Sequence, residues 1–395
     1  MPRLRFPGFE GEWCAEYFDD VATGFEYGLN ATAVDFDGVH KYIRITDIDD
    51  TSHKFIGSPV VSPAGEIDEK YRVRPNDILL ARTGASTGKS YLYDSSDGGL
   101  YFAGFLIRAS VKPEYDARFV FYSTCTPTYR HWVNMISMRS GQPGINADEY
   151  SRYNLNIPTH SEQVQIGTFL ALLDSKITAQ HKLVKLLKKH KRGLHSAIFG
   201  QKCRVVNADG KPWPAWRQVR IGDIFQERSE RGGTADELLS VTINNGVKRQ
   251  ADTDKKDSSS EDKSNYKKVL PGDIVYNTMR MWQGASGVSP WAGIVSPAYT
   301  VIYPRGRQNT TFWAYAFKYW RLIQEFQKFS QGLTSDTWNL KYPQLSDIRV
   351  YEPSIDEQEA IVDILSMLDE RVSAAEQELN KMRNLKSGLL QQLFV

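Results

Sequence analysis

The sequence predicts an α+β protein with a pseudo-twofold internal repeat, in which two mixed α/β domains are separated by two long helices that pair as an antiparallel coiled coil. Three observations support this fold class. At 395 residues, the chain is longer than a single hydrophobic core usually grows. Its second half repeats the pattern of its first half. Each half ends in a long stretch with apolar residues at coiled-coil spacing.

The internal repeat has a period of 195 residues, and around the helical stretches it needs no gap. Glu162 matches Glu357 and Asp174 matches Asp369 at this spacing. Upstream the match is looser, with RPNDILLARTG from Arg74 against LPGDIVYNTMR from Leu270 and RSGQPGIN from Arg139 against SQGLTSDTWNL from Ser330. We therefore expect a domain at 1–158, a spacer helix at 159–200, a second domain at 201–353 and a second spacer helix at 354–395.

The two helical stretches carry the spacing of a coiled-coil seam. Steps of four and three residues from Ile166 meet apolar residues at eight of ten positions, and the same steps from Ile361 do so at nine of ten. The central seam positions are Leu173, Ile177, Val184 and Leu187 in the first helix, and Leu368, Val372, Leu379 and Met382 in the second. The alternative is two amphipathic helices that each pack on their own domain, since globular helices also carry apolar stripes.

Charge favours an antiparallel pairing of the two helices. The first stretch holds seven basic residues against two acidic ones, and the second holds eight acidic residues against four basic ones. Antiparallel alignment sets the basic run 182–192 opposite the acidic run 363–373, whereas parallel alignment would set it opposite Lys381, Arg383 and Lys386. At a rise of ~1.5 Å per residue, each helix would span roughly 58 Å, which suits a spacer.

Each domain is expected to combine short strands with helices. The predicted strands are DILLA from Asp77, YFAGFLIRA from Tyr101, DIVY from Asp273 and SPAYTVIY from Ser296, and the predicted helices are FVFYSTCT from Phe119 and TFWAYAFKYW from Thr311.

Signatures of catalysis are weak throughout the chain. The segment GASTGKS, from Gly84, resembles a phosphate-binding loop, but Thr83 stands where that motif needs a glycine. The histidines lack metal-ligand spacing, the three cysteines lie far apart, and neither a dinucleotide fingerprint nor a G-x-S-x-G elbow is present. We therefore expect no catalytic residue, no metal and no cofactor.

The remaining candidates for function are two pairs of polar loops at matching places in the repeat. Arg suits guanine and Asn or Gln suits adenine in the major groove, while Lys, Ser and Thr hold phosphates. The candidate DNA-binding residues are Arg82, Thr83, Lys89, Arg139, Gln142 and Asn146 in the first half, and Asn277, Arg280, Gln283, Gln331, Thr334, Asn339 and Lys341 in the second. Any one of them can instead serve turn chemistry, so their recurrence in both halves carries the functional interpretation.

Several short motifs make the sequence resemble a known family over nearly its whole length. They are FPGFEGEW from Phe6, the PxxxEQxxI pattern from Pro158 and from Pro353, the LLD and MLD triplets that end at Asp174 and Asp369, and the KxGLxxxxF endings at Phe199 and Phe394. In combination they are typical of the specificity subunits of type I restriction-modification systems.

The resemblance implies a non-catalytic DNA-binding subunit. Its two target-recognition domains would bind the unequal halves of a bipartite, asymmetric site in double-stranded DNA, and its helices would hold the domains apart. Modification (methyltransferase) subunits, two of them by resemblance, and ATP-dependent restriction subunits would be the partners.

Two other functions are weighed against this one. The first is a self-contained DNA methyltransferase or nucleotide-dependent enzyme that uses the Gly84 loop, and the second is a tandem interaction scaffold with no role in nucleic-acid binding.

The net charge of only +2 means that attraction to DNA must come from local patches. The lack of a long uncharged apolar run or a signal-peptide core predicts a cytoplasmic protein that does not enter the membrane.

Overall fold

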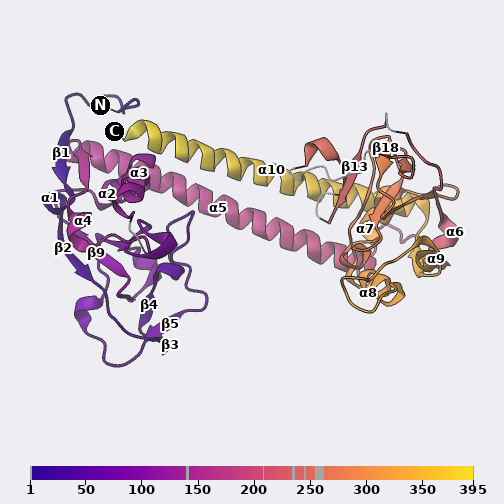
Figure 1. Ribbon diagram of the computed structural model, residues 1–395, viewed down its shortest axis with the longest axis horizontal. Coiled ribbons are helices and arrows are strands. Elements are labelled where there is room, and N and C mark those ends of the chain that lie inside the picture. The colour runs from indigo at the N-terminus through magenta and orange to yellow at the C-terminus, as the bar shows by residue number, and fades with distance from the viewer. Residues whose placement is uncertain are drawn as a thin grey trace. The chain divides into compact units, whose positions relative to one another are not determined.

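The chain forms two compact units in a computed structural model that describes residues 2–138, 142–207, 209–233, 236–243, 246–253 and 262–394. Unit 1 comprises Met1–Leu183 with Ala375–Val395, and unit 2 comprises Val184–Ala374. Each unit therefore contains part of both long helices, α5 (His160–Phe199) and α10 (Ile355–Leu393). The elements are labelled in Figure 1.

Unit 1 is built around an antiparallel four-stranded sheet with strand order β2-β9-β6-β7, flanked by the pairs β1-β10, β3-β5 and the parallel pair β4-β8. Its elements are β1 (Cys14–Tyr17), α1 (Phe18–Val21), β2 (Ala22–Tyr27), β3 (Ala33–Asp35), β4 (Lys41–Ile43), β5 (Val61–Pro63), β6 (Asp77–Ala81), β7 (Ser90–Leu92), β8 (Leu100–Phe102), β9 (Leu106–Val111), α2 (Ala117–Ser123), α3 (Pro127–Ile136), α4 (Ala147–Ser151) and β10 (Asn154–Ile157). All five residues of β6 are buried, as expected of a central strand.

Unit 2 repeats the four-stranded sheet and the pair of first and last strands, while its other two-stranded pairs differ. Its four-stranded sheet has the order β12-β19-β16-β17, and β11-β20, β13-β14 and β15-β18 are its two-stranded pairs. Its elements are β11 (Arg217–Arg220), α6 (Ile221–Ile224), β12 (Phe225–Glu227), β13 (Leu239–Thr242), β14 (Gly246–Arg249), β15 (Lys267–Val269), β16 (Ile274–Asn277), β17 (Ser286–Val288), β18 (Gly293–Val295), β19 (Tyr299–Pro304), α7 (Thr310–Ala316), α8 (Trp320–Phe329), α9 (Tyr342–Ser346) and β20 (Arg349–Glu352). The matching strand orders confirm the internal repeat.

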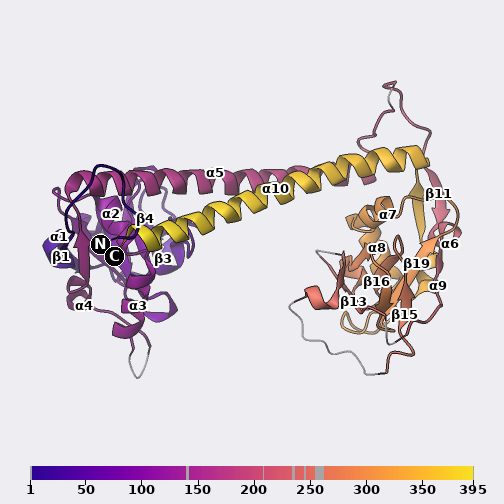
Figure 2. The same ribbon diagram turned by 90° about the horizontal axis from the view of Figure 1, so that it is seen from above.

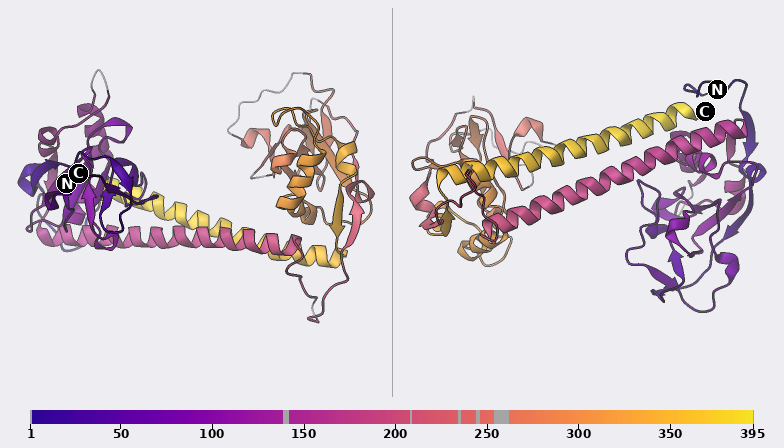
Figure 3. Two further views of the ribbon diagram at one scale, coloured as in Figure 1. Left: turned by 90° about the horizontal axis from the view of Figure 1, so that it is seen from below. Right: turned by 180° about the vertical axis from the view of Figure 1, so that it is seen from behind.

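The two long helices lie side by side and antiparallel within each unit (Figures 1 and 3). In unit 1, Lys386 Nζ lies 2.6 Å from Asp174 Oδ1, and Gln180 Nε2 donates to the carbonyl oxygen of Ala375 at 2.9 Å. In unit 2, Lys191 pairs with Asp369, which joins the basic and acidic runs. The predicted antiparallel coiled coil is thus confirmed. Of the predicted seam positions, Leu173, Val184, Leu368 and Leu379 are buried, and Ile177, Leu187, Val372 and Met382 are half-buried.

Each unit's main core holds the start of one long helix and the end of the other. In unit 1, Ile166 near the start of α5 shares a core with Leu393 of α10, and Phe394 stacks on Phe119 with ring centroids 5.1 Å apart. In unit 2, the core contains Ile361 of α10 and Phe199 of α5. The helix termini therefore belong to the domains as much as to the coiled coil.

The Glu-Gln pair at the start of each long helix joins it to the chain around it. Glu162 is fully buried and receives two hydrogen bonds of 2.8 Å from Arg5. Glu357 is equally buried and pairs with Arg204, with the closest approach at 2.8 Å. Gln163, which follows Glu162, donates from its side-chain Nε2 to the Pro158 carbonyl oxygen at 2.9 Å. Its Oε1 accepts from the Asp116 amide at 3.0 Å. The PxxxEQ motif thus has a structural role in both copies.

A domain helix packs on one long helix in each unit. Figure 2 shows α2 beside α5 and α7 beside α10. Tyr122 of α2 donates to Asp174 at 2.7 Å, and Tyr315 of α7 donates to Asp369 at 2.7 Å. Each aspartate therefore contacts a lysine of the paired helix and a tyrosine of the domain, which fixes the domain to the coiled coil within its unit.

Two predicted elements are interrupted. The stretch YFAGFLIRA was expected to be one strand, but β8 ends at Phe102 and β9 begins at Leu106, because a turn closes when the Leu106 amide donates to the Ala103 carbonyl oxygen at 2.8 Å. The stretch TFWAYAFKYW was expected to be one helix. It is divided between α7, which ends at Ala316, and α8, which begins at Trp320.

Candidate nucleic-acid interface

The candidate site in each unit begins with a tight turn that leads into the central strand. In unit 1, Asp77 Oδ2 accepts from the Arg74 amide at 2.8 Å, and Asn76 adopts a positive φ of 69°. In unit 2, Asp273 Oδ2 accepts from the Leu270 amide at 2.8 Å, and Gly272 adopts a φ of 91°. The repeated x-P-x-D sequence thus makes the same turn twice, with residue types that tolerate the left-handed region.

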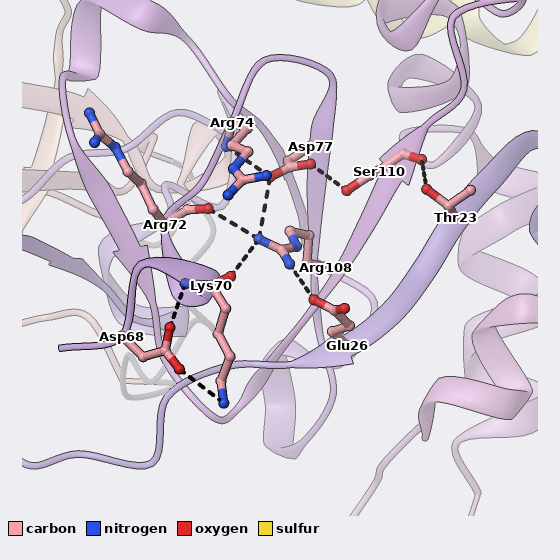
Figure 4. A network of polar contacts seen from close by, with 9 residues as sticks. All are labelled: Thr23, Glu26, Asp68, Lys70, Arg72, Arg74, Asp77, Arg108 and Ser110. Atoms are coloured by element: carbon pink, nitrogen blue, oxygen red, sulfur yellow. Dashed lines mark hydrogen bonds and ion pairs between the residues drawn. The ribbon is translucent and has the colours of Figure 1, made fainter.

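An arginine stabilises the carboxylate of each turn. Figure 4 shows the network in unit 1, where Arg108 lies 3.9 Å from Asp77 and also contacts Glu26. Burial raises the pKa of Asp77 above its ordinary value, while a hydrogen bond from Ser110 opposes this shift. In unit 2, Arg228 binds Asp273 with two bonds of 2.7 and 2.9 Å. These buried groups hold the turn.

The predicted loop pair of the first half comes together in unit 1. Residues 82–89, which follow β6, form the strand-end loop of unit 1, and residues 142–146 form its return segment. The Gly84 amide donates to the Pro143 carbonyl oxygen at 3.0 Å, and the Ile145 amide donates to the Arg82 carbonyl oxygen at 2.9 Å. Thr83 and Gly144 also form an antiparallel bridge.

The same arrangement recurs in unit 2. Its strand-end loop is 277–284, which starts on the last residue of β16, and its return segment is 331–341. The Leu340 amide donates to the Thr278 carbonyl oxygen at 2.9 Å, which is the equivalent of the bond from Ile145 to Arg82. Trp282 and Trp338 meet edge to face, with ring centroids 5.2 Å apart. In both units, backbone hydrogen bonds between residues more than fifty positions apart in the sequence join the two segments into one composite surface.

The predicted residues of unit 1 differ in how available they are. Gln142 is exposed, and Thr83 is half-buried. Arg82 is half-buried with its guanidinium 4.7 Å from the ring centroid of Tyr27. Arg139 lies outside the described residues.

Two predicted residues of unit 1 have intramolecular partners. The Lys89 side chain is only 10% exposed, and its amine donates to the Ile48 carbonyl oxygen at 3.0 Å and pairs with Asp50. Asn146 caps α4, because its Oδ1 accepts from the Glu149 amide at 2.8 Å. Both residues shape the composite surface from within.

Most predicted residues of unit 2 are accessible. Gln283, Gln331, Thr334 and Lys341 are exposed, and Arg280 is half-buried. Asn277 Oδ1 accepts from the Met279 amide at 3.0 Å. Asn339 is bridged to Gln331 through two backbone hydrogen bonds, and its buried Oδ1 has no hydrogen-bond partner among the described residues.

Apolar side chains at these surfaces were not among the predicted site residues. Leu333, in the return segment of unit 2, is fully exposed, and Met138, just before the undescribed residues of unit 1, is 78% exposed. An apolar residue inside a polar loop is the only sequence signal that could have marked them. Such side chains suit contacts with thymine methyl groups or base faces.

The Gly84 segment does not form a phosphate cradle. Gly84–Ser86 is a short 3₁₀ turn, and the amides of Thr87, Gly88 and Lys89 donate to backbone carbonyl oxygens of the same region at 2.9–3.1 Å. These amides are therefore occupied, whereas a phosphate-binding loop presents them to the ligand. Within the described residues, no group of His, Cys, Asp and Glu side chains could hold a metal ion. Among the helices searched, none has the length and apolar character needed to cross a membrane.

Comparison with known proteins agrees with this architecture. Residues 29–189 and 215–383 match the model of the type I restriction modification DNA specificity domain. The crystal structure of a type I restriction-modification S subunit from M. genitalium is similar, with a TM-score of 0.62 at 15% identity over 100% of this chain and 99% of that chain.

Two further solved structures share the fold. The HsdS subunit from Thermoanaerobacter tengcongensis gives a TM-score of 0.50 at 17% identity, covering 99% of this chain and 97% of that one. A chain from a study of complex assembly and conformational transition in the type I R-M system gives 0.54 at 16% identity, covering 96% and 97%. The family match covers most of the sequence in two copies, one in each half, and the chain therefore belongs to the type I restriction modification DNA specificity domain family.

Proposed function

We propose that this chain is the non-catalytic specificity subunit of a type I restriction-modification complex and that it recognises a bipartite, asymmetric target in double-stranded DNA. The observation that carries the proposal is the repeated composite surface, in which a strand-end loop and a return segment meet after β6 and again after β16. A repeated fold with one such surface in each copy suits a target in two parts.

Each domain would bind one half of the target. Residues 1–158 would bind one half-site and residues 201–353 the other, while 159–200 and 354–395 would serve as spacers. Because the two return segments differ in sequence and length, the half-sites would be unequal and the target non-palindromic. A pair of antiparallel helices resists bending better than a loop does. Such a pair therefore suits a fixed gap between half-sites.

Base contacts are assigned first to the exposed polar side chains. Gln142 in unit 1, with Gln283 and Gln331 in unit 2, can bond base edges, and Lys341 can hold a phosphate. Arg82, Arg139 and Arg280 would suit guanine, while Asn277 and Asn339 would suit adenine. Thr83 and Thr334 add hydroxyl groups. Lys89 and Asn146 would support the surface, because their polar atoms already have partners.

Modification subunits, two in number, and restriction subunits would be the protein partners. Leu172 on α5 is 62% exposed and Met367 on α10 is 60% exposed, and the two positions are 195 residues apart, so each would offer an equivalent apolar contact to one modification subunit. Gly193 and Gly388 are also matched, and a Cβ at either would meet no described atom within 4 Å. An approaching helix could therefore come close to each. Such a complex would modify DNA in the cytoplasm.

The first experiment is methylome sequencing of cells with and without this subunit, which should reveal one asymmetric motif that disappears with the gene. Replacing residues 1–158 with those of a relative should then change one half-site and leave the other intact. A change in both half-sites would contradict domain-by-domain recognition. Methylation by the isolated chain would contradict the non-catalytic role.

A further inference from the structure

A basic pocket lies in unit 2, next to the end of its strand-end loop. It has a volume of about 860 Å³, and α5, α7, α10 and the β17 edge contribute to its walls. The residues that define it for the argument are Lys188, Lys191, Arg192, Ser286, Lys318 and Asp369. No described residue of the composite surface lines this basic pocket, but Lys318 of the pocket contacts the carbonyl oxygen of Gly284, the last residue of the strand-end loop.

Positive charge dominates the basic pocket. Among its lining residues Asp369 is the single acid, and it already pairs with Lys191. Arg192 and Lys318 line the same space. Residues brought together in this way create a positive potential that a bound anion would neutralise.

Lys318 is the most informative of these cations. Its amine donates to the carbonyl oxygen of Ile243 at 3.0 Å and also contacts the carbonyl oxygen of Gly284. No carboxylate pairs with it among the described residues, and burial lowers its pKa to about 8. A desolvated ammonium group without a counter-ion is unfavourable, so a nearby anion would stabilise it.

The pocket also offers a hydroxyl group. Ser286 is fully buried, and its Oγ has no hydrogen-bond partner in the described part of the chain. Since Lys318 bonds Gly284, the last residue of the strand-end loop, an anion in the pocket would lie beside residues that are proposed to contact bases. Phosphate contacts of this kind fix the register of a protein on the duplex while other residues read the bases.

We propose that the basic pocket binds a backbone phosphate of DNA next to the second half-site, with Arg192 and Lys318 as the main contacts. This inference rests on the proposed function and adds to it a phosphate anchor outside the predicted loops. In this proposal Arg192 of α5 contacts DNA, whereas the neighbouring Lys191 pairs with Asp369 of α10.

The test uses the chain assembled with its modification subunits and a duplex that carries the target found by methylome sequencing. The variants are Arg192→Gln and Lys318→Gln, and Arg192 is exposed, so its replacement leaves the core intact. Lys189→Gln is the matched control, because it removes the same charge from the same helix at an exposed position that does not line the pocket. Affinity is measured from about 50 to about 200 mM salt.

Removal of one of the two cations that hold the phosphate should make the plot of log affinity against log salt less steep, by up to about 0.9 in slope for each pocket variant, with target preference unchanged. The control should keep the wild-type slope. A scan of single methylphosphonate substitutions should find one phosphate whose neutralisation weakens the wild type more than it weakens Arg192→Gln.

Pocket variants with the slope of the control would overturn the inference, even if the wild type binds its target selectively. So would a loss of assembly with modification subunits at an unchanged salt slope, because the pocket would then bind an acidic protein segment. The inference would also fail if inorganic phosphate competed for the pocket while no single methylphosphonate substitution in the DNA weakened binding. The pocket would then bind a free anion. A wild-type complex without sequence preference would instead contradict the proposed function itself.

Discussion

Lys386 on α10 places its Nζ 2.6 Å from Asp174 Oδ1 on α5, and the matched pair Lys191 and Asp369 repeats this contact in unit 2. Lys386 and Lys191 are the charged residues of the two apolar seams, and each pairs with an acid on the other helix. Each lysine also lies over the ring of a domain tyrosine, Tyr122 or Tyr315. The ion pair is thus part of a contact between coiled coil and domain.

Removal of the acid should therefore destabilise unit 1. Asp174→Ala would leave the Lys386 ammonium and the Tyr122 hydroxyl without their partner in a largely buried place, and we expect a loss of about 2–3 kcal/mol in the free energy of unfolding. Urea denaturation followed by circular dichroism measures it. The double variant Asp174→Ala, Lys386→Met should recover part of the loss, whereas additive effects of the two changes would show that the pair does not interact.

Glu162 and Arg5 provide a second stability test. Glu162 is fully buried, so Arg5→Ala should leave its carboxylate buried without a partner. We expect the free energy of unfolding to fall by about 3 kcal/mol or more. Thermal unfolding of Arg5→Ala and of its counterpart Arg204→Ala should show losses in unit 1 and unit 2 respectively. Arg3→Ala, at an exposed neighbouring position, is the control and should leave unfolding unchanged.

Stability should fall on acidification because of His195. Burial lowers its pKa, and its Nε2 bonds the Tyr315 carbonyl oxygen at 2.9 Å. The unfolded chain, with a histidine pKa of about 6.5, then binds more protons than the folded chain, so stability is lost as pH falls below that value. His195→Gln should reduce the slope of unfolding free energy against pH between about 7 and about 5. An unchanged slope would assign the effect to other groups.

Base recognition should be separable between the units. Gln283→Ala and Gln331→Ala should each relax preference at one position of the second half-site by about 1–3 kcal/mol, if their amides bond a base. Gln142→Ala is the reciprocal control and should affect the first half-site only. Binding competition with single-position target variants measures each effect, and a uniform loss across all positions would instead indicate phosphate contacts.

The repeat and the helix pairing could be predicted because both depend on patterns that are local or strictly periodic. Seam residues such as Leu173 and Leu379 recur at coiled-coil spacing, and the charges of the two helices select their direction. The interruption between β8 and β9 could not be predicted, because the turn at 103–106 depends on contacts with residues 28–29 from a distant segment.

The predicted site residues show the same limit. Asn146 and Gln142 looked equally suited to base contacts, yet Asn146 caps α4 and Gln142 is exposed. Lys89 belongs to a loop that resembles a phosphate-binding motif, but it pairs with Asp50, far away in the sequence. Sequence pattern located the loops, while tertiary contacts decide which side chains in them remain available.

Gly193 and Gly388 offer a test that separates the free chain from its complex. Both lie inside continuous helices, and a Cβ at either position would meet no described atom within 4 Å. Gly193→Ala and Gly388→Ala should therefore stabilise the isolated chain by up to about 1 kcal/mol through helix propensity. If a modification subunit packs closely on each glycine, the added methyl groups should weaken assembly, measured by sedimentation of the mixed subunits. Ser373→Ala, at an exposed position on α10, is the control for assembly. Stabilisation with unchanged assembly would show that the modification subunits dock elsewhere than at the glycines. Destabilisation of the free chain would show that the helices are not continuous there.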